Sequence, residues 1–151
     1  MQDVPDKTTS TCIAFDYGTR RIGLAVGDAQ IQTASPLGVA DNNSGTPDWH
    51  KIDNFIEQWQ PAALIVGWPL TESGQEQTIT QHTKGFIKRL EKRYFLPVHK
   101  VDERYSSIAA QQEMKQMRQR GQRKRKTTHA DIDTLAAALI LETWFTLKSL
   151  Q

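Results

Sequence analysis

Short apolar runs separated by polar links mark the first forty residues of the chain. The segments 11–16 (TCIAFD) and 22–26 (IGLAV) are rich in apolar and β-branched residues, and Gly18 to Arg21 lie between them. Two such runs joined by a short glycine-containing link predict a β-hairpin. A third extended piece is expected over 31–39. The start of the chain therefore predicts an antiparallel meander.

A helical spacing of apolar residues follows a polar loop. Thr46 and Pro47 offer an N-cap and a proline at the first helical position, and Pro61 is a stop. We therefore predict a helix over 47–60. Its large apolar residues share one face: Trp49, Ile52, Phe55, Ile56 and Trp59.

Strands and helices alternate further along the chain. The continuous apolar run 63–67 (ALIVG) is typical of a strand buried on both faces. A helix over 75–94 and a strand over 97–102 are expected next. Ser106 or Ser107 can cap a further helix that ends near Arg120.

A last helix is expected over 130–148, after a basic loop at 122–128. Its predicted inner face follows helical spacing: Ile132, Leu135, Ala136, Leu139, Ile140 and Thr143. The full order is then β-β-β-α-β-α-β-α-α. This order predicts an α/β fold with a mixed sheet and helices on both faces. We expect one domain over 12–148, preceded by a disordered lead-in over 1–11.

Composition narrows the class of protein. The chain has 151 residues and one cysteine, which excludes an intramolecular disulfide framework and a zinc cluster of several thiolates. No apolar run approaches the ~18 residues that a membrane span needs. The polar start lacks the order of a signal peptide, so we expect a cytoplasmic protein.

The charge is unevenly distributed. Seven basic residues and no acidic ones lie between Met114 and Thr128: Lys115, Arg118, Arg120, Arg123, Lys124, Arg125 and Lys126. Without this basic arm, twelve basic residues face seventeen acidic ones, a balance of −5. Such a segment attracts nucleic acid backbones, although it also suits a solvated loop.

Three acids lie at the ends of predicted elements. Asp16 closes the first strand, Glu103 follows the strand that ends at Asp102, and Asp133 lies in the first turn of the last helix. Acids that converge at strand ends need a partner, and oxygen-only ligands favour Mg²⁺ or Mn²⁺. Two such ions can promote phosphodiester hydrolysis.

The last helix offers two candidate acids. Asp133 lies at the edge of the predicted apolar stripe, about 100° from Ile132, and Asp131 lies about as far to the other side. Only one of them can point into a given site. Each could instead stabilise the positive end of the helix dipole.

Four motifs resemble one family in order and spacing. They are FDYGTRRIGLAVGD (15–28), IVGWPLTESGQEQ (65–77), VDERYSS (101–107) and DIDTLAAALIL (131–141). Together they resemble the YqgF/RuvX family, whose members are described as pre-16S rRNA nucleases and, earlier, as Holliday junction resolvases. The resemblance runs from about Cys12 to Phe145. It implies a ribonuclease H-like fold and a cytoplasmic, metal-dependent nuclease that helps to trim the 5′ end of the 16S rRNA precursor.

The resemblance also implies roles for individual residues. The family's acids match Asp16, Glu103 and Asp133, which would hold Mg²⁺ or Mn²⁺, with Asp102 as a substitute or partner for Glu103. Arg104 is an expected phosphate contact, since guanidinium matches phosphate oxygens. The nucleic-acid contacts expected overall are Arg20, Arg21, Arg104, Arg118, Arg123, Lys124, Arg125 and Lys126.

Some positions depart from the family pattern. Trp68 stands where leucine is common and could stack on an unpaired base. Ser107 stands where the family usually has threonine. The Asp-x-x-Asp ending of the related RuvC junction resolvases is absent, since the chain has Asp131-x-Asp133.

Three functions follow as expectations. The first is an endonuclease on RNA, with pre-16S rRNA and ribosomal precursor particles as partners and a monomer or weak dimer as the working form. The second is a resolvase of branched DNA, which a stable dimer would favour. The third is a non-catalytic RNA-binding assembly factor.

Overall fold

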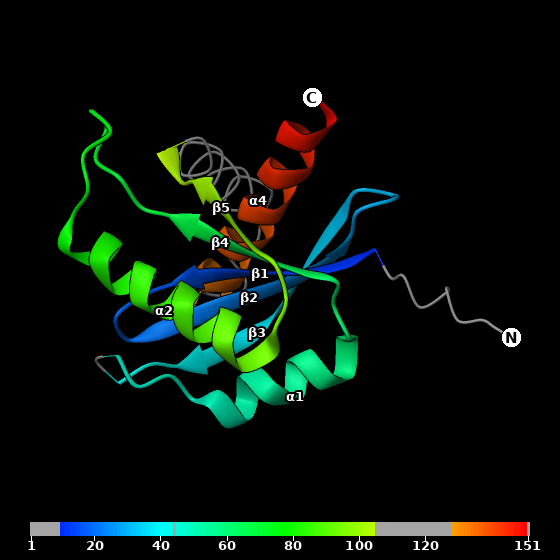
Figure 1. Cartoon of the computed structure of the whole chain (residues 1–151), viewed down its shortest axis with the longest axis horizontal. Helices are drawn as coiled ribbons and strands as arrows, with labels where there is room; N and C mark the ends of the chain where they lie inside the picture. Colours follow the sequence, from blue (N-terminus) through cyan, green and yellow to red (C-terminus); the bar gives the residue numbers. More distant parts are fainter. Residues whose placement is uncertain (1–9, 44, 105–127, 151) are drawn as a thin grey trace, which may run out of the picture.

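The computed structural model describes residues 10–43, 45–104 and 128–150. Its described strands and helices follow the predicted order, with three strands first and helices and strands alternating after them (Figure 1). The strands are β1 (Thr11–Tyr17), β2 (Arg21–Asp28), β3 (Thr33–Asp41), β4 (Ala63–Trp68) and β5 (Val98–Asp102). The helices are α1 (Trp49–Trp59), α2 (Thr78–Tyr94) and α4 (His129–Ser149).

The five strands form one mixed sheet in the order β3-β2-β1-β4-β5. β1, β2 and β3 pair in antiparallel fashion, because a tight turn joins each strand to the next. In the first turn the Gly18 amide donates to the Arg21 carbonyl at 3.0 Å. β4 and β5 run parallel to β1, since α1 and α2 carry the chain back between them. The predicted α/β fold class is confirmed.

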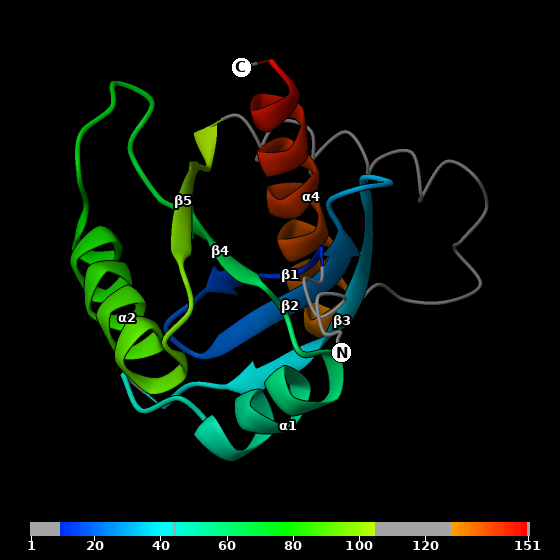
Figure 2. The same cartoon turned by 45° about the vertical axis from the view of Figure 1, so that its right-hand side comes forward.

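Helices cover both faces of the sheet (Figures 1 and 2). α1 and α2 lie on one face, where Phe15 of β1 packs with Ile52 of α1 and Phe86 of α2. α4 lies on the other face, where Ala14 of β1 packs with Ile140. Because side chains alternate along a strand, Asp16 falls on the α4 face.

Several predicted boundaries need correction. α1 begins at Trp49 rather than at residue 47, because the Asp48 carboxylate accepts from the Lys51 amide at 3.2 Å and caps the helix in place of Thr46. Trp59 was predicted on the inner face, but it lies in the last turn and is 38% exposed. The third strand spans Thr33–Asp41 instead of 31–39.

The buried face of α4 also differs from the prediction. Ile132 is 42% exposed, and the buried residues are Ala137, Ala138, Ile140, Leu141 and Phe145. Apolar residues lie on every side of this helix, so periodicity could not select the inner face. Ala137 and Ala138 pack against Ala25 of β2, and their small size suits close packing on the sheet.

Part of the predicted organisation lies outside the described residues. Of the lead-in expected over 1–11, only Ser10 and Thr11 are described: Thr11 opens β1, and the Ser10 hydroxyl donates to Asp28 at 2.8 Å. The rest of that lead-in lies outside the described residues. So do the helix predicted from Ser106 or Ser107 to Arg120 and nearly all of the basic loop. No helix within the described residues is long and apolar enough to cross a membrane.

Candidate active site

Asp16 lies near the end of β1, on the face that α4 covers. It stands opposite Gly23 of β2 in the antiparallel register. Its neighbours along the strand, Phe15 and Tyr17, are buried on the other face. β1 is therefore apolar on both faces except near its C-terminal end, where the Asp16 carboxylate lies on the α4 face.

Glu103 is held beside the same end of the sheet. Its amide donates to the Trp68 carbonyl of β4 at 3.0 Å, which continues the pairing of β4 with β5 by one residue. Its side chain turns toward Gly67 of β4. A Cβ built at Gly67 would lie 2.7 Å from Glu103 Oε2 and 2.6 Å from the Ile140 side chain. Gly67 therefore leaves the room that the Glu103 carboxyl occupies.

Asp133 approaches from α4, in its second turn rather than the first. It lies one helical turn before the buried Ala137 and two before the buried Leu141, and is itself half-buried. A Cβ built at Gly23 would lie only 2.2 Å from the Asp133 carbonyl oxygen. Gly23 thus brings α4 against the strand beside Asp16.

Asp131 has a different place. Its carboxylate accepts from the Thr128 amide at 3.0 Å, and the Thr128 hydroxyl accepts from the Asp131 amide at 3.1 Å. This pair is a capping box at the start of α4. Of the two candidate acids on this helix, Asp133 is the one that the fold directs at the sheet.

Burial and mutual repulsion act on the acids of this site. Burial, with the Asp133 charge, raises the pKa of Asp16 to about 6. Burial, with the charges of Asp16 and then Asp102, raises the pKa of Glu103 to about 8. Like charges that gather in a poorly solvated place favour a bound cation or a shared proton.

Two nearby acids already have cationic partners. Arg21 Nε donates to Asp133 Oδ2 at 2.8 Å. Arg104 contacts both carboxylate oxygens of Asp102, with Nη2 at 2.6 Å from Oδ2, and this pairing lowers the pKa of Asp102. Within the described ranges no group of three acidic, histidine or cysteine side chains is placed to hold a metal ion. The Asp133 carboxylate points toward Arg21.

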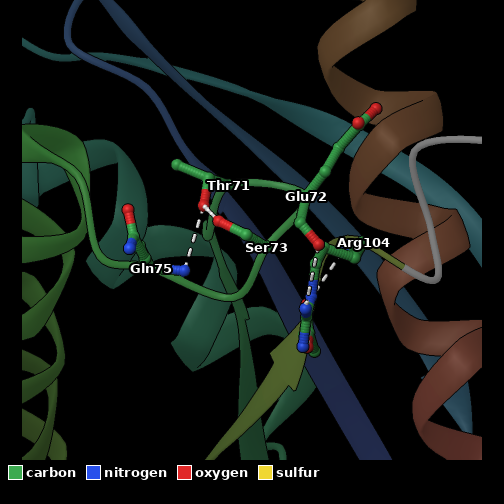
Figure 3. A network of polar contacts seen from close by, with 6 residues as sticks. Thr71, Glu72, Ser73, Gln75 and Arg104 are labelled. Atoms are coloured by element: carbon green, nitrogen blue, oxygen red, sulfur yellow. Dashed lines mark hydrogen bonds and ion pairs between the residues drawn. The ribbon is translucent and has the colours of Figure 1, made fainter.

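Arg104 also fixes the loop that follows β4 (Figure 3). Its Nη1 donates to the Glu72 carbonyl at 3.3 Å, and a Cβ built at Gly74 would lie 3.1 Å from that nitrogen. The Thr71 hydroxyl contacts Ser73 and accepts from the Gln75 amide, both at 3.0 Å. The loop beside Glu103 is therefore ordered around one guanidinium.

Comparison with known proteins identifies the family. The family model RuvX, described as Holliday junction resolvase, matches residues 10–147. A Legionella pneumophila (strain Paris) protein is 43% identical over 132 residues, which cover 87% of this chain and 92% of its own length. A Francisella tularensis subsp. tularensis (strain WY96-3418) protein is 38% identical, with 87% and 93% covered. Both relatives carry the name "Putative pre-16S rRNA nuclease".

The chain belongs to the RuvX family. Its fold is also that of the junction resolvases. Thermus thermophilus RuvC in complex with a Holliday junction matches with a TM-score of 0.57 at 17% identity, covering 93% of this chain and 96% of RuvC. The yeast mitochondrial Holliday junction resolvase matches at 0.56 and 11% identity, covering 93% and 80%.

The predicted nucleic-acid contacts of this RuvX chain are only partly described. Arg20 is exposed in the turn between β1 and β2, whereas Arg21 and Arg104 are half-buried and engaged with carboxylates. The other predicted contacts lie outside the described residues: Arg118, Arg123, Lys124, Arg125 and Lys126.

Two aromatic positions of the RuvX chain have defined surroundings. The Lys100 ammonium lies 4.3 Å from the centre of the Trp68 ring, so a base that stacked on this face would displace a cation. His99 stacks on Trp144 at 4.5 Å and burial lowers its pKa, which fits a packing role for this histidine.

Sequence reasoning missed the two glycines that shape the RuvX site. Gly23 and Gly67 lie inside strands, and each leaves space for an acid or for the helix that carries one. A glycine in the interior of a strand weakens it and often marks a close approach. A glycine within an apolar run was visible in the sequence at Gly23 of IGLAV (22–26) and at Gly67 of ALIVG (63–67).

Proposed function

We propose that this protein is a divalent-metal-dependent endonuclease that hydrolyses RNA phosphodiesters and matures the 5′ end of pre-16S rRNA. The observation that carries the proposal is the juxtaposition of Asp16 and Glu103, two half-buried acids whose pKa values are raised: that of Glu103 by burial and the Asp16 charge, and that of Asp16 by burial and the Asp133 charge. Membership of the RuvX family and the names of the relatives support the nuclease class and the RNA substrate.

The donor chemistry of the acids suits a hard divalent cation. Asp16 and Glu103 are half-buried with like charges for neighbours, while Asp133 and Asp102 are each paired with an arginine. Carboxylate oxygens are the donors that Mg²⁺ and Mn²⁺ prefer. We propose Asp16, Glu103 and Asp133 as the ligands, with Asp133 turning away from Arg21 to complete the set.

A divalent cation bound there would supply Lewis-acid stabilisation and a water of lowered pKa. The chain's own residues prepare for it. Since its pKa is raised to about 8, Glu103 would hold a proton at neutral pH in the metal-free protein and would lose it where a cation bound. The Arg21 guanidinium, which now pairs with Asp133, would be placed to meet the phosphate that carries the scissile bond. Hydrolysis adds water across one P–O ester bond, with no covalent enzyme intermediate.

The remaining predicted contacts would hold the substrate. Arg20, Arg104 and the basic arm 115–126 are proposed to bind the RNA backbone. The partners that we propose are precursor 16S rRNA, free or in ribosomal precursor particles. We propose the cytoplasm as the compartment, and a monomer or weak dimer as the working form.

A second candidate function is the resolution of branched DNA. The description of the family model and the fold of the junction resolvases favour it. Resolution needs two cuts related by a two-fold axis, so a stable dimer would support it and a monomer would oppose it. A third candidate is an RNA-binding assembly factor without catalysis. It would show no Mn²⁺ binding that depends on Asp16.

One assay separates the three. A 16S precursor 5′ fragment and a four-way DNA junction are incubated with the protein and either Mg²⁺ or Mn²⁺. Asp16→Asn, purified identically, reports contaminating ribonuclease. Asp131→Asn is the matched control for Asp133→Asn, because both acids lie on α4 and only Asp133 faces the sheet.

The expected result is metal-dependent RNA cleavage that Asp16→Asn and Asp133→Asn abolish and Asp131→Asn retains. Junction cleavage without RNA cleavage would favour the second candidate. Activity that is the same in wild type and Asp16→Asn would overturn the nuclease proposal.

A further inference from the structure

The second concentration of positive charge in the chain is on helix α2. Outside the basic arm the chain has twelve Lys and Arg residues, and five of them lie on this helix with a single acid, Glu91. All five are exposed: Lys84, Lys88, Arg89, Lys92 and Arg93. Since the chain without the basic arm carries −5 and α2 carries +4, the remainder carries −9. α2 is therefore a basic surface on an acidic body.

The C-terminal half of this helix forms an open groove with α1. The groove has a volume of about 470 Å³ and is lined by Trp49, Arg89, Lys92 and Arg93. The guanidinium carbons of Arg89 and Arg93 lie 5.6 Å and 5.0 Å from the centre of the Trp49 ring. Phe86 stacks on the same ring at 5.8 Å. One half-buried indole thus orders two guanidinium groups at the surface.

Further contacts hold both arginines in place. Arg93 donates to the two carboxylate oxygens of Asp53 at 2.8 and 2.6 Å. Arg89 Nη1 donates to the Gly45 carbonyl at 2.7 Å. Side chains ordered in advance lose less entropy when an anion binds, and a planar guanidinium matches phosphate oxygens.

Stability alone does not account for this arrangement. Lys92 and Arg93 in the last turn complement the helix dipole, and Asp53 neutralises Arg93. However, Arg89 and Arg93 are like charges one helical turn apart, which is unfavourable. Within the described ranges no carboxylate forms an ion pair with Lys88, Arg89 or Lys92. The uncompensated charge faces solvent.

We infer that the groove of Trp49, Arg89, Lys92 and Arg93 is a second binding site for the RNA backbone, on the sheet face opposite the acids. α1 and α2 cover that face (Figure 2), whereas Asp16 lies on the α4 face because side chains alternate along β1. The inference rests on the proposed function, because it assigns the groove to a more distant part of the same RNA. Trp49 is covered by Phe86 and the arginines, so the site reads phosphates rather than bases.

The test measures RNA affinity rather than cleavage. Binding of the 16S precursor 5′ fragment and of a four-way DNA junction is followed by fluorescence anisotropy at several salt concentrations. The full chain carries Asp16→Asn, and divalent cations are omitted. Lys92→Glu is compared with Lys148→Glu. Both lysines are exposed and lie in the last turn of their helices, so the charge change and the dipole penalty match.

Lys92→Glu is expected to weaken RNA binding about five- to tenfold at ~0.1 M salt and to lower the salt slope by about 1. Arg89→Gln should weaken binding in the same direction, and Lys148→Glu should leave affinity unchanged. Equal effects of Lys92→Glu and Lys148→Glu would overturn the inference, as would a loss confined to junction DNA. Absence of RNA cleavage by the wild type would count against the proposed function only, since the groove is judged by binding.

Discussion

Gly23 and Asp133 are in direct backbone contact: a Cβ on the glycine would lie 2.2 Å from the aspartate's carbonyl oxygen. Any side chain at position 23 must therefore push α4 away from β2. Overpacking of this kind typically costs about 1–3 kcal/mol. We expect Gly23→Ala to lower the free energy of unfolding by about that amount, and to abolish cleavage by displacing Asp133. Thermal denaturation and the cleavage assay measure the two effects.

Gly85→Ala is the control for this substitution. No atom lies within 4 Å of a Cβ built at Gly85, which is exposed within α2. Because alanine is the better helix former, this variant should gain about 1 kcal/mol. If Gly23→Ala were as stable and active as the wild type, the close approach of α4 to β2 would be wrong.

The buried acids predict how stability depends on pH in the metal-free protein. The pKa of Asp16 rises from 3.8 to about 6 on folding, so the folded state prefers the neutral acid. Below pH 3.8 the Asp16 carboxyl is protonated in both the folded and the unfolded state, so it adds nothing to the pH dependence of stability. Above about 6 the folded state bears the full cost of the charge, on the order of 3 kcal/mol. The free energy of unfolding should therefore fall from pH 4 to pH 6.

Glu103 extends that fall toward pH 8, because its pKa is raised from 4.5 to about 8. Asp16→Asn should be more stable than the wild type at pH 8 and equal to it near pH 4. Denaturant unfolding in the presence of a chelator measures both. A wild type that is as stable as Asp16→Asn at pH 8 would contradict the burial of this carboxylate. Mn²⁺ should stabilise the wild type more than the variant.

The sequence predicts most of the sheet but not the orientation of its last helix. Short apolar runs bounded by turns or by helical spacing were enough to locate the five strands. α4 is apolar on all sides, so Ile132 was placed inside and Ala137 was not. The inner face was decided by close packing against Ala25 and Gly23, a contact between distant parts of the chain.

The same limit applies to the site. Asp16 and Glu103 were predicted from their positions at strand ends, and the structure brings both to one end of the sheet. The pairing of Arg21 with Asp133 joins residues 112 positions apart, and no local pattern encodes it. Arg104 was predicted to contact phosphate, a role that stays a prediction. Its observed partners are Asp102 and the Glu72 carbonyl.

The ion pair of Arg21 with Asp133 predicts a competition. The Arg21 guanidinium lies 2.8 Å from one carboxylate oxygen of Asp133, which we propose as a metal ligand. Replacing it with a neutral side chain removes the competing cation. Arg21→Gln should therefore bind Mn²⁺ a few-fold more tightly than the wild type, and titration calorimetry without RNA measures this. Arg20→Gln removes the same charge from the exposed neighbour and should change the affinity little. Weaker Mn²⁺ binding by Arg21→Gln would show that the arginine orients Asp133 for the metal instead.

The contacts of Arg104 predict that it orders the loop beside Glu103. Its guanidinium bonds Asp102 and the Glu72 carbonyl and lies against Gly74. Without it, the loop keeps the bonds of Thr71 with Ser73, Gly74 and Gln75 and the bridge between Leu70 and Glu76. Arg104→Gln should therefore speed amide hydrogen exchange over residues 71–75 at least tenfold, because local opening costs less by ~1.4 kcal/mol or more.

Glu72→Ala is the matched variant for this experiment. Only the main-chain carbonyl of Glu72 accepts from Arg104, so removing its exposed side chain should leave the exchange rates of the loop unchanged. Exchange in α2, measured on the same samples, reports whether either substitution loosens the domain as a whole. Loop exchange in Arg104→Gln that matches the wild type would contradict this prediction, since the loop's other bonds would then hold it without the guanidinium.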